Sequence, residues 1–398
     1  MFSTVFLMLV LIFQPSKLDT GYFYFGNTNL IGVGQLKDGY KSGEWKIYPK
    51  TYPDDFPKNS ILEADPADFK RNFNHETPLF IMNFEAGIPN GDFLENYPNG
   101  KPKVMVHQKD GVFEGEFGEF YESRELRLKG KVLDGKKEGE WLEYSKSGKI
   151  ISYMTYSNGY AEGKGLGYYP NGNLEWEGYF KNGELDGVYT YYLSDSTLKV
   201  KGQYSGGIPV GEWMEKLEIL PGFYRKGNYQ DGFKEGEWGL INLEGENVQT
   251  EYYEKGKLIS ISEFKVPDLV VDKGKVKNGK GRRIFYDGDG NILAKGKVSR
   301  GKEVGVWYFY FPESNRISAA GKLEGNDRIG TWNFYSYQGE IIDQKRYQTP
   351  DGHWEAMRKR SRRSSGKQKW NPNSSQDQGN RNFGSMGQNI ETYGAFLK

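Results

Sequence analysis

A glycine-centred pattern recurs every 24 residues over most of this chain. From Gly87 to Gly207 it repeats at this constant step, and after Gly207 the step varies between 22 and 25 residues. Each clear copy, such as GKKEGEWLEY from Gly135, has a second glycine four residues after the first and a large aromatic residue two residues later. A fixed period of this length indicates a repeat array, in which each unit buries its apolar face by stacking on its neighbours.

The large aromatic residues of the pattern are the candidate structural residues of the array. Because a single unit cannot bury such a side chain alone, we expect these rings to pack between neighbouring units rather than to bind a ligand. They are Trp45, Phe93, Phe117, Trp141, Tyr189, Trp213, Trp238, Trp307 and Trp332.

Each unit has the residues of a β-hairpin. The first glycine usually follows Asp or Asn, a pair that tolerates the positive φ angles of a tight turn, and we expect the second glycine to close that loop. A second turn signal lies between units, for example Pro98-Asn99-Gly100. The chain is therefore predicted to be all-β: an elongated, single-layer antiparallel meander of about twelve stacked 24-residue hairpins.

The repeat divides the chain into segments. The apolar run from Val5 to Phe13 has the length of a signal-peptide core, so we interpret residues 1–18 as a signal peptide, with an anchor or a buried first strand as alternatives. The other segments are a first repeat at 22–49, an irregular insertion at 50–79, the main array at 80–347 and a disordered basic and polar tail at 348–398.

The insertion interrupts the period. The distance from Gly39 to Gly87 is 48 residues, which we interpret as two steps with one unit overwritten. The prolines and aspartates of this segment are typical of an ordered loop or short helix. Such a segment either carries contacts or simply caps the sheet, and the sequence leaves both readings open.

The repeating unit, G-x-[VLYF]-x-[DN]-G-x-x-x-G-x-W-x-x-Y, resembles the MORN repeat, especially its bacterial variant with antitoxin-like members. Clear copies begin at Gly34 (GQLKDGYKSGEWKIY), Gly130 (GKVLDGKKEGEWLEY) and Gly227 (GNYQDGFKEGEWGLI), and the resemblance covers about residues 30–345. It implies an elongated sheet of stacked hairpins that contacts proteins or lipids and has no catalytic residues of its own.

Three units depart from this pattern. Gly165 occupies an aromatic position, the unit of Gly256 lacks its second glycine, and the loop from Gly279 to Gly281 is shortened. We interpret these places either as bends in the array or as decayed repeats.

One stretch imitates a phosphate-binding loop. Gly296, Gly301 and Lys302 have the spacing of G-x-x-x-x-G-K-[ST], but Glu303 stands where Ser or Thr would reach Mg²⁺. The repeat produces the same spacing from Gly130 to Lys136, so we expect no nucleotide and no other cofactor here.

Other chemistry-bearing residues are few. The chain has no Cys, and His75, His107 and His353 are too scattered for a metal or acid–base centre. We therefore predict no catalytic residue, no metal site and no enzymatic activity.

Acidic residues recur directly after the second glycine of the pattern. They could form a row that binds cations or a basic partner, but we favour a solvated strand whose charges discourage edge pairing. They are Glu44, Asp92, Glu116, Glu140, Glu212 and Glu237.

The tail is the most basic segment, since residues 358–369 hold seven basic side chains and no acidic one. Such a run can contact an anionic membrane surface or an acidic protein surface, and the alternative is a passive solvated tail. Nucleic acid is an unlikely partner because the net charge is only +1 and export is expected. The candidate contact residues are Arg358, Lys359, Arg360, Arg362 and Arg363.

Together these features predict a non-catalytic, exported repeat scaffold, periplasmic or associated with a bacterial cell envelope, that binds an unknown protein partner. One alternative is a cytoplasmic antitoxin-like protein that inhibits its partner by direct binding. Another is a repeat protein that associates with anionic lipid.

Overall fold

The computed structural model describes residues 18–25, 30–49, 61–64, 77–217, 222–266, 269–272, 274–325 and 327–347. Every regular element in these ranges is a β-strand, and neighbouring strands pair in antiparallel orientation. The predicted all-β meander of hairpins is confirmed. The described residues form two compact units, one ending at Tyr160 and the other beginning at Ala161.

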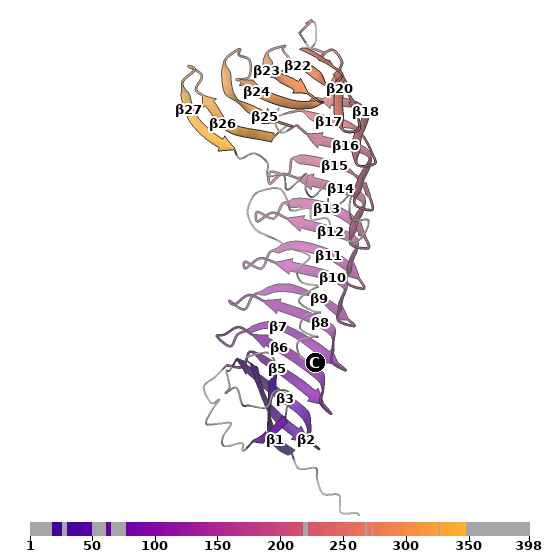
Figure 1. Cartoon of the computed structure of the whole chain (residues 1–398), viewed down its shortest axis with the longest axis vertical. Helices are drawn as coiled ribbons and strands as arrows, with labels where there is room; N and C mark the ends of the chain where they lie inside the picture. Colours follow the sequence, from indigo (N-terminus) through magenta and orange to yellow (C-terminus); the bar gives the residue numbers. More distant parts are fainter. Residues whose placement is uncertain are drawn as a thin grey trace, which may run out of the picture. The chain divides into compact units, whose positions relative to one another are not determined.

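The first unit is a meander in which strands β5 to β11 pair in chain order, as consecutive hairpins (Figure 1). Its strands are β1 (Leu18–Phe25), β2 (Leu30–Lys37), β3 (Tyr40–Pro49), β4 (Ile61–Ala64), β5 (Phe80–Glu85), β6 (Ile88–Asn96), β7 (Pro102–Lys109), β8 (Val112–Phe120), β9 (Leu126–Leu133), β10 (Lys136–Tyr144) and β11 (Ile150–Ser157).

The insertion does not replace a repeat unit. Strand β3 pairs directly with β5, so that Trp45 lies opposite Met82, and the Gly87 amide donates a hydrogen bond of 2.9 Å to the Lys41 carbonyl. The interpretation of two steps with one unit overwritten is therefore wrong, because the hairpins on either side stack directly. Strand β4, within the insertion, instead pairs with β1.

The second unit contains two sheets. Its strands of the first sheet are β12 (Tyr160–Tyr168), β13 (Leu174–Lys181), β14 (Glu184–Tyr192), β15 (Leu198–Ser205), β16 (Ile208–Lys216), β17 (Tyr224–Gln230), β18 (Phe233–Ile241), β19 (Asn247–Glu254) and β20 (Lys257–Ile261). The second comprises β21 (Gly274–Lys277), β22 (Lys280–Tyr286), β23 (Ile292–Ser299), β24 (Lys302–Tyr310), β25 (Ile317–Glu324), β26 (Asp327–Tyr335) and β27 (Ile341–Tyr347).

The break between these sheets lies at two of the three departures from the repeat. Strand β20 follows Gly256 and is short, and β21 ends just before Gly279. The hairpins still contact one another across the break, since the Gly279 amide donates to the carbonyl of Ile259 in β20 at 3.0 Å. At Gly165, by contrast, β12 continues without interruption.

The two glycines of each repeat have different roles. Asp134 and Gly135 both have positive φ (50° and 71°), as a type I′ hairpin turn requires. The second glycine, Gly139 (φ 67°), lies inside β10, where the pairing with β9 shifts register between Glu138 and Leu142. The expectation that it closes the turn is wrong: it provides the positive φ of a β-bulge.

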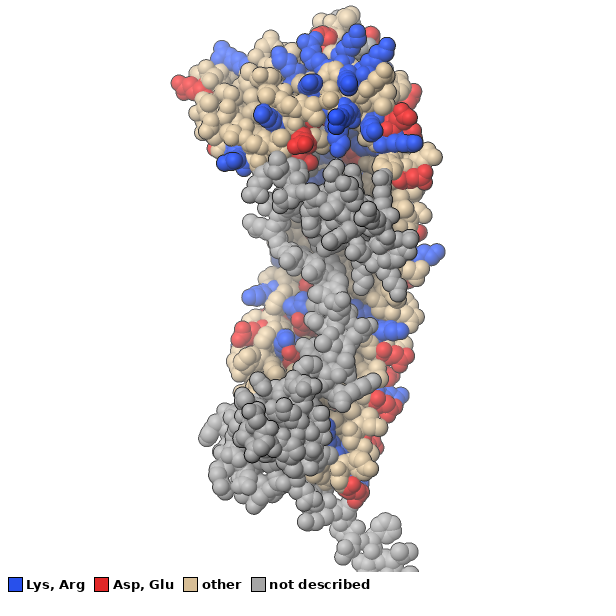
Figure 2. Space-filling model, in the orientation of Figure 1, with Lys and Arg blue, Asp and Glu red and all other residues tan. Residues whose placement is uncertain are grey.

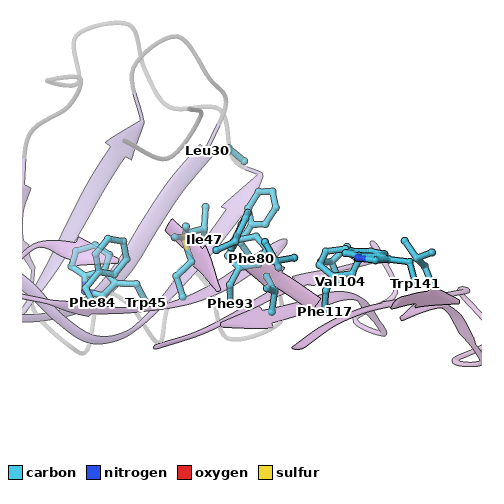
Figure 3. Packing of buried hydrophobic residues seen from close by; sticks show 14 of the residues in the cluster. Leu30, Trp45, Ile47, Phe80, Phe84, Phe93, Val104, Phe117 and Trp141 are labelled. Carbon is cyan, nitrogen blue, oxygen red and sulfur yellow. The ribbon is translucent and has the colours of Figure 1, made fainter. Parts of the chain in front are cut away.

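Aromatic and aliphatic side chains form the core of each unit. In the first unit they gather on one side of the sheet (Figure 3), where neighbouring rings touch, as in Phe117 and Trp141 with centroids 5.3 Å apart. In the second unit one cluster draws residues from both sheets, including Leu240 and Val248 from the first and Phe285 and Trp307 from the second. The stacking of each hairpin on the next thus buries the rings.

Candidate functional site

The nine aromatic residues that the repeat singles out are all buried in the structure. The tryptophans share one environment, because each ring lies against a glycine of the preceding strand. A Cβ added to Gly296 would overlap the ring of Trp307, and one on Gly130 would overlap that of Trp141. The glycine that opens each tryptophan-containing repeat is therefore needed for close packing, a reason that the sequence pattern alone does not disclose.

Cations cover several of these rings. Lys137 Nζ lies 4.4 Å from the centroid of Trp141, and Lys234 Nζ lies 4.2 Å from that of Trp238. Lys41 lies over Phe23, Phe84 and Trp45, and its burial lowers its pKa to about 8. Each cation stands four residues before its tryptophan, so it belongs to the structural pattern.

Acidic residues directly before the second glycine hold the next hairpin in place. Glu138 accepts a hydrogen bond of 2.9 Å from the Asn158 amide, and Glu162 accepts one of 2.8 Å from the Asn182 amide. The donor amides belong to turn residues with positive φ. These carboxylates therefore have a structural partner within the array.

Three of the six acidic residues after the second glycine have a base on the neighbouring strand and so do not form a purely acidic row. Glu116 lies opposite Lys131, Asp92 Oδ1 is 3.1 Å from His107 Nδ1, and Glu212 lies 3.3 Å from Lys226. Of the three histidines, only His107 falls within the described residues. No group of His, Asp and Glu that could hold a metal ion occurs in the described part of the chain.

A cluster of buried charges joins the two sheets of the second unit. Arg225 of β17 binds Glu251 of β19 with Nε 2.9 Å from Oε2. Arg283 of β22 donates to Glu251 and lies 3.3 Å from Glu303 of β24. Tyr253 donates to Glu251 at 2.6 Å. Arg283 and Glu251 have no solvent exposure.

The electrostatics of this cluster favour the charged forms. Burial alone would raise the pKa of Glu251, but Arg225 and Arg283 outweigh it and hold that pKa well below its usual range. Burial raises the pKa of Tyr253 well above its usual value, so Tyr253 is a permanent donor. The charges of this network are paired, although Arg225 Nη2 and Arg283 Nε have no hydrogen-bond partner among the described residues. We interpret the network as a structural link between the sheets.

Sequence reasoning missed this cluster because its members come from distant repeat units. One signal was available: Glu303 occupies the position that Lys137 and Lys234 hold in other units, four residues before the tryptophan. An acidic residue at a position where other repeats have a buried lysine indicates that the side chain pairs with a basic residue rather than with the tryptophan ring.

An exposed apolar stripe follows the hairpin turns of the first unit. Each member directly follows the turn glycine, and the exposed fractions are 60% for Tyr40, 50% for Ile88, 37% for Val112 and 55% for Tyr160. A Cβ on Gly87 would lie 3.4 Å from the Tyr40 ring, and one on Gly135 would lie 3.6 Å from Val112 Cγ1, so these side chains lie against the next turn. We call these four residues the hairpin-edge stripe.

A basic face covers part of the second sheet. Between residues 273 and 302 the sequence has ten Lys or Arg and only two Asp. Lys275 lies opposite Arg282, and Arg282 lies opposite Lys297, so three cations form one row across β21, β22 and β23. Figure 2 shows Lys and Arg side chains gathered in the region where Figure 1 places β22 to β24. The sequence alone does not reveal this face, because the pairing of neighbouring strands brings these residues together.

Several predicted segments lie outside the described residues. These are the signal peptide except for its last residue, most of the insertion, His75, His353 and the whole tail. The tail includes Arg358, Lys359, Arg360, Arg362 and Arg363. Within the described ranges, no helix has the length and hydropathy required to cross a bilayer.

Three segments of the chain match the family model of the MORN repeat variant: residues 137–158, 161–182 and 246–265. Each segment spans most of two consecutive strands, β10 and β11, β12 and β13, or β19 and β20, in agreement with the observed meander. The chain therefore contains repeats of the MORN variant at these three places. The MORN repeat fold is typically non-catalytic and commonly contacts proteins or membrane lipids.

Other comparisons add little about this protein. No protein with a curated function matches its sequence. Similar solved structures include a mutant Tc holotoxin pore of Photorhabdus luminescens, at 10% identity over 80% of this chain and 21% of that chain, with a TM-score of 0.13. The chain thus spans about a fifth of the length of the toxin chain, and a TM-score this low supports no argument about fold or function.

Proposed function

We propose that this protein is a non-catalytic scaffold that binds a protein partner along the hairpin-edge stripe. The observation that carries the proposal is the exposure of Tyr40, Ile88, Val112 and Tyr160 at four of five consecutive hairpin turns. Lys136 holds the same position in the remaining turn. Scattered exposed apolar residues are ordinary, but an aligned series of them is typical of an interaction surface.

The spacing of the stripe suits a helical partner. Successive hairpins of a meander lie two strands apart, or roughly 10 Å, and seven residues of an α-helix advance by about the same distance. A helix with apolar residues at every seventh position would therefore place one side chain on each hairpin. Asp38, Asp110 and Asp134 in the turns favour basic residues beside that apolar series.

A matched pair of variants tests the proposal. Ile88→Lys combined with Val112→Lys changes the stripe, and Ile150→Lys changes an apolar residue of similar exposure away from these turns. Crosslinked capture from envelope fractions identifies the partner, and its dissociation constant is then measured with purified proteins. We expect the stripe variant to weaken binding at least about tenfold and the control to leave it unchanged. Equal binding by both variants would contradict the proposal.

We further propose that the protein is exported and acts at a bacterial cell envelope. The apolar run from Val5 to Phe13 supports this location. Cell fractionation with sequencing of the mature N-terminus is the test. An intact Met1 on a soluble cytosolic protein would favour the cytoplasmic antitoxin-like alternative.

A second candidate function is association with anionic lipid. Like charges placed opposite one another on neighbouring strands destabilise a sheet, and an anionic surface would offset that cost for Lys275 and Lys297. Arg282, which lies between them, already pairs with Asp272. The basic residues of the tail would add to this attraction.

Vesicle binding separates the two contributions. Sedimentation with vesicles of phosphatidylcholine and phosphatidylserine is compared with phosphatidylcholine alone, using Lys275→Glu with Lys297→Glu, and a variant lacking 348–398. Loss of binding in the first variant would place the contact on the sheet, and loss only in the second would place it in the tail. Binding that neither change affects would count against both.

A further inference from the structure

Strand β27 (Ile341–Tyr347) lies at an edge of the second sheet. It pairs with β26, and among the described residues no strand pairs with its other side. Six of its seven residues are exposed, including Ile341 at 53% and Ile342 at 68%. An exposed edge of this kind presents free backbone donors and acceptors to another strand.

We propose that β27 pairs with β27 of a second copy of this chain. The inference is independent of the hairpin-edge stripe, which lies in the first unit. It rests on the charges of the strand, which complement each other in an antiparallel self-pair.

The register of such a pair follows from symmetry. When two identical antiparallel strands are related by a two-fold axis, one residue lies opposite itself. If that residue were Asp343 or Lys345, identical charges would face each other. With Gln344 at the centre, each Asp343 instead lies opposite Lys345 of the second copy, which is favourable by a few tenths to about 1 kcal/mol for each pair.

The remaining pairs in this register are also compatible. Ile342 lies opposite Arg346 of the second copy, whose aliphatic stem can cover it, and Ile341 lies opposite Tyr347. Within one chain, Lys345 Nζ already lies 3.6 Å from Asp343 Oδ2, because alternate residues share a face of the strand. Lysine on an edge strand usually discourages pairing, but here Asp343 makes the charge series self-complementary.

Sedimentation velocity of the full chain over a range of concentrations tests the proposal. We expect a reversible dimer of the natural chain. Asp343→Lys alone and Lys345→Asp alone should each raise the dimer dissociation constant about tenfold or more, because both introduce like charges at two places. Leu243→Lys, at a residue 73% exposed in the turn between β18 and β19, is the control and should dimerise normally.

Mixing the two single variants gives the decisive measurement. An equimolar mixture should form a heterodimer, since every pair of opposed charges is then complementary, and the variant with both substitutions should form a homodimer. Circular dichroism verifies that each variant is folded. A natural chain that remains monomeric, single variants that still dimerise, or a mixture that does not associate would each overturn the proposal. If the edge of β27 instead binds a strand of another protein, the purified natural chain would remain monomeric.

Discussion

The hairpins of Trp141 and Trp307 have the same template but use one position differently. In both, the tryptophan is buried against a glycine eleven residues earlier. Four residues before Trp141, Lys137 covers the ring; four residues before Trp307, Glu303 binds Arg283 of the neighbouring strand. The comparison teaches that a repeat can preserve its stacking and still use one variable position to join two sheets.

The strongest test of what the hairpins share is removal of the rings. Trp141→Ala and Trp307→Ala should each reduce the free energy of unfolding by about 3 to 5 kcal/mol, because each leaves a large cavity in a packed core. Urea denaturation measures the change. A Trp307→Ala protein of normal stability that no longer binds its partner would instead assign this ring to a binding site.

The difference between the hairpins is tested at the charges. Arg283→Met should cost roughly 3 kcal/mol, because Glu251 and Glu303 would lose a partner without access to water. Lys137→Met, which removes a cation over a ring, should cost only about 1 kcal/mol. Equal losses in the two variants would show that the cluster adds nothing beyond ordinary stacking.

The contact between glycine and tryptophan should appear as energetic coupling. Gly130→Ala and Gly296→Ala should each cost about 1 to 3 kcal/mol, since the new methyl group has no space beside the ring. In the Trp307→Ala background, Gly296→Ala should become nearly neutral. A double-mutant cycle measures this coupling, and simple additivity would contradict the packing explanation.

Acid should weaken the second unit through Glu251. Its pKa in the folded chain lies well below the ordinary value of 4.5, so its stabilisation is complete above that pH and is lost as the pH falls towards the folded pKa. Glu251→Gln should flatten this dependence below about pH 4.5. Hydrogen exchange of β17, β19 and β22 between pH 3 and pH 6 measures how the stability of these strands depends on pH. The same pH dependence in the natural chain and in the variant would contradict the role of Glu251.

The smallest effect is expected at Lys302, the residue that imitates a phosphate-loop lysine. It is exposed and directly follows the turn glycine of the Trp307 hairpin. Lys302→Ala should change stability by less than about 0.5 kcal/mol. Calorimetry with ATP and Mg²⁺ should show no binding by either protein; binding that the substitution removes would revive the nucleotide hypothesis.

Much of the fold was predictable because the repeat is local. A pair such as Asp134-Gly135 specifies a tight turn by its own backbone preferences, and the spacing to Trp141 marks the buried face. Other features were not predictable from one unit. The bulge at Gly139 and the direct pairing of β3 with β5 depend on which strand lies opposite, and a repeat pattern does not contain that information.

The sequence by itself determined the hairpins, their period and their buried aromatic residues, since turn chemistry and strand alternation act over a few residues. Only the tertiary structure decided where the array divides into two sheets, and which charges meet between them. Arg225, Glu251 and Arg283 lie far apart in the chain, and their partners depend on the packing of whole sheets. The stripe, the basic face and the edge of β27 emerge for the same reason: they are surfaces that stacking leaves uncovered.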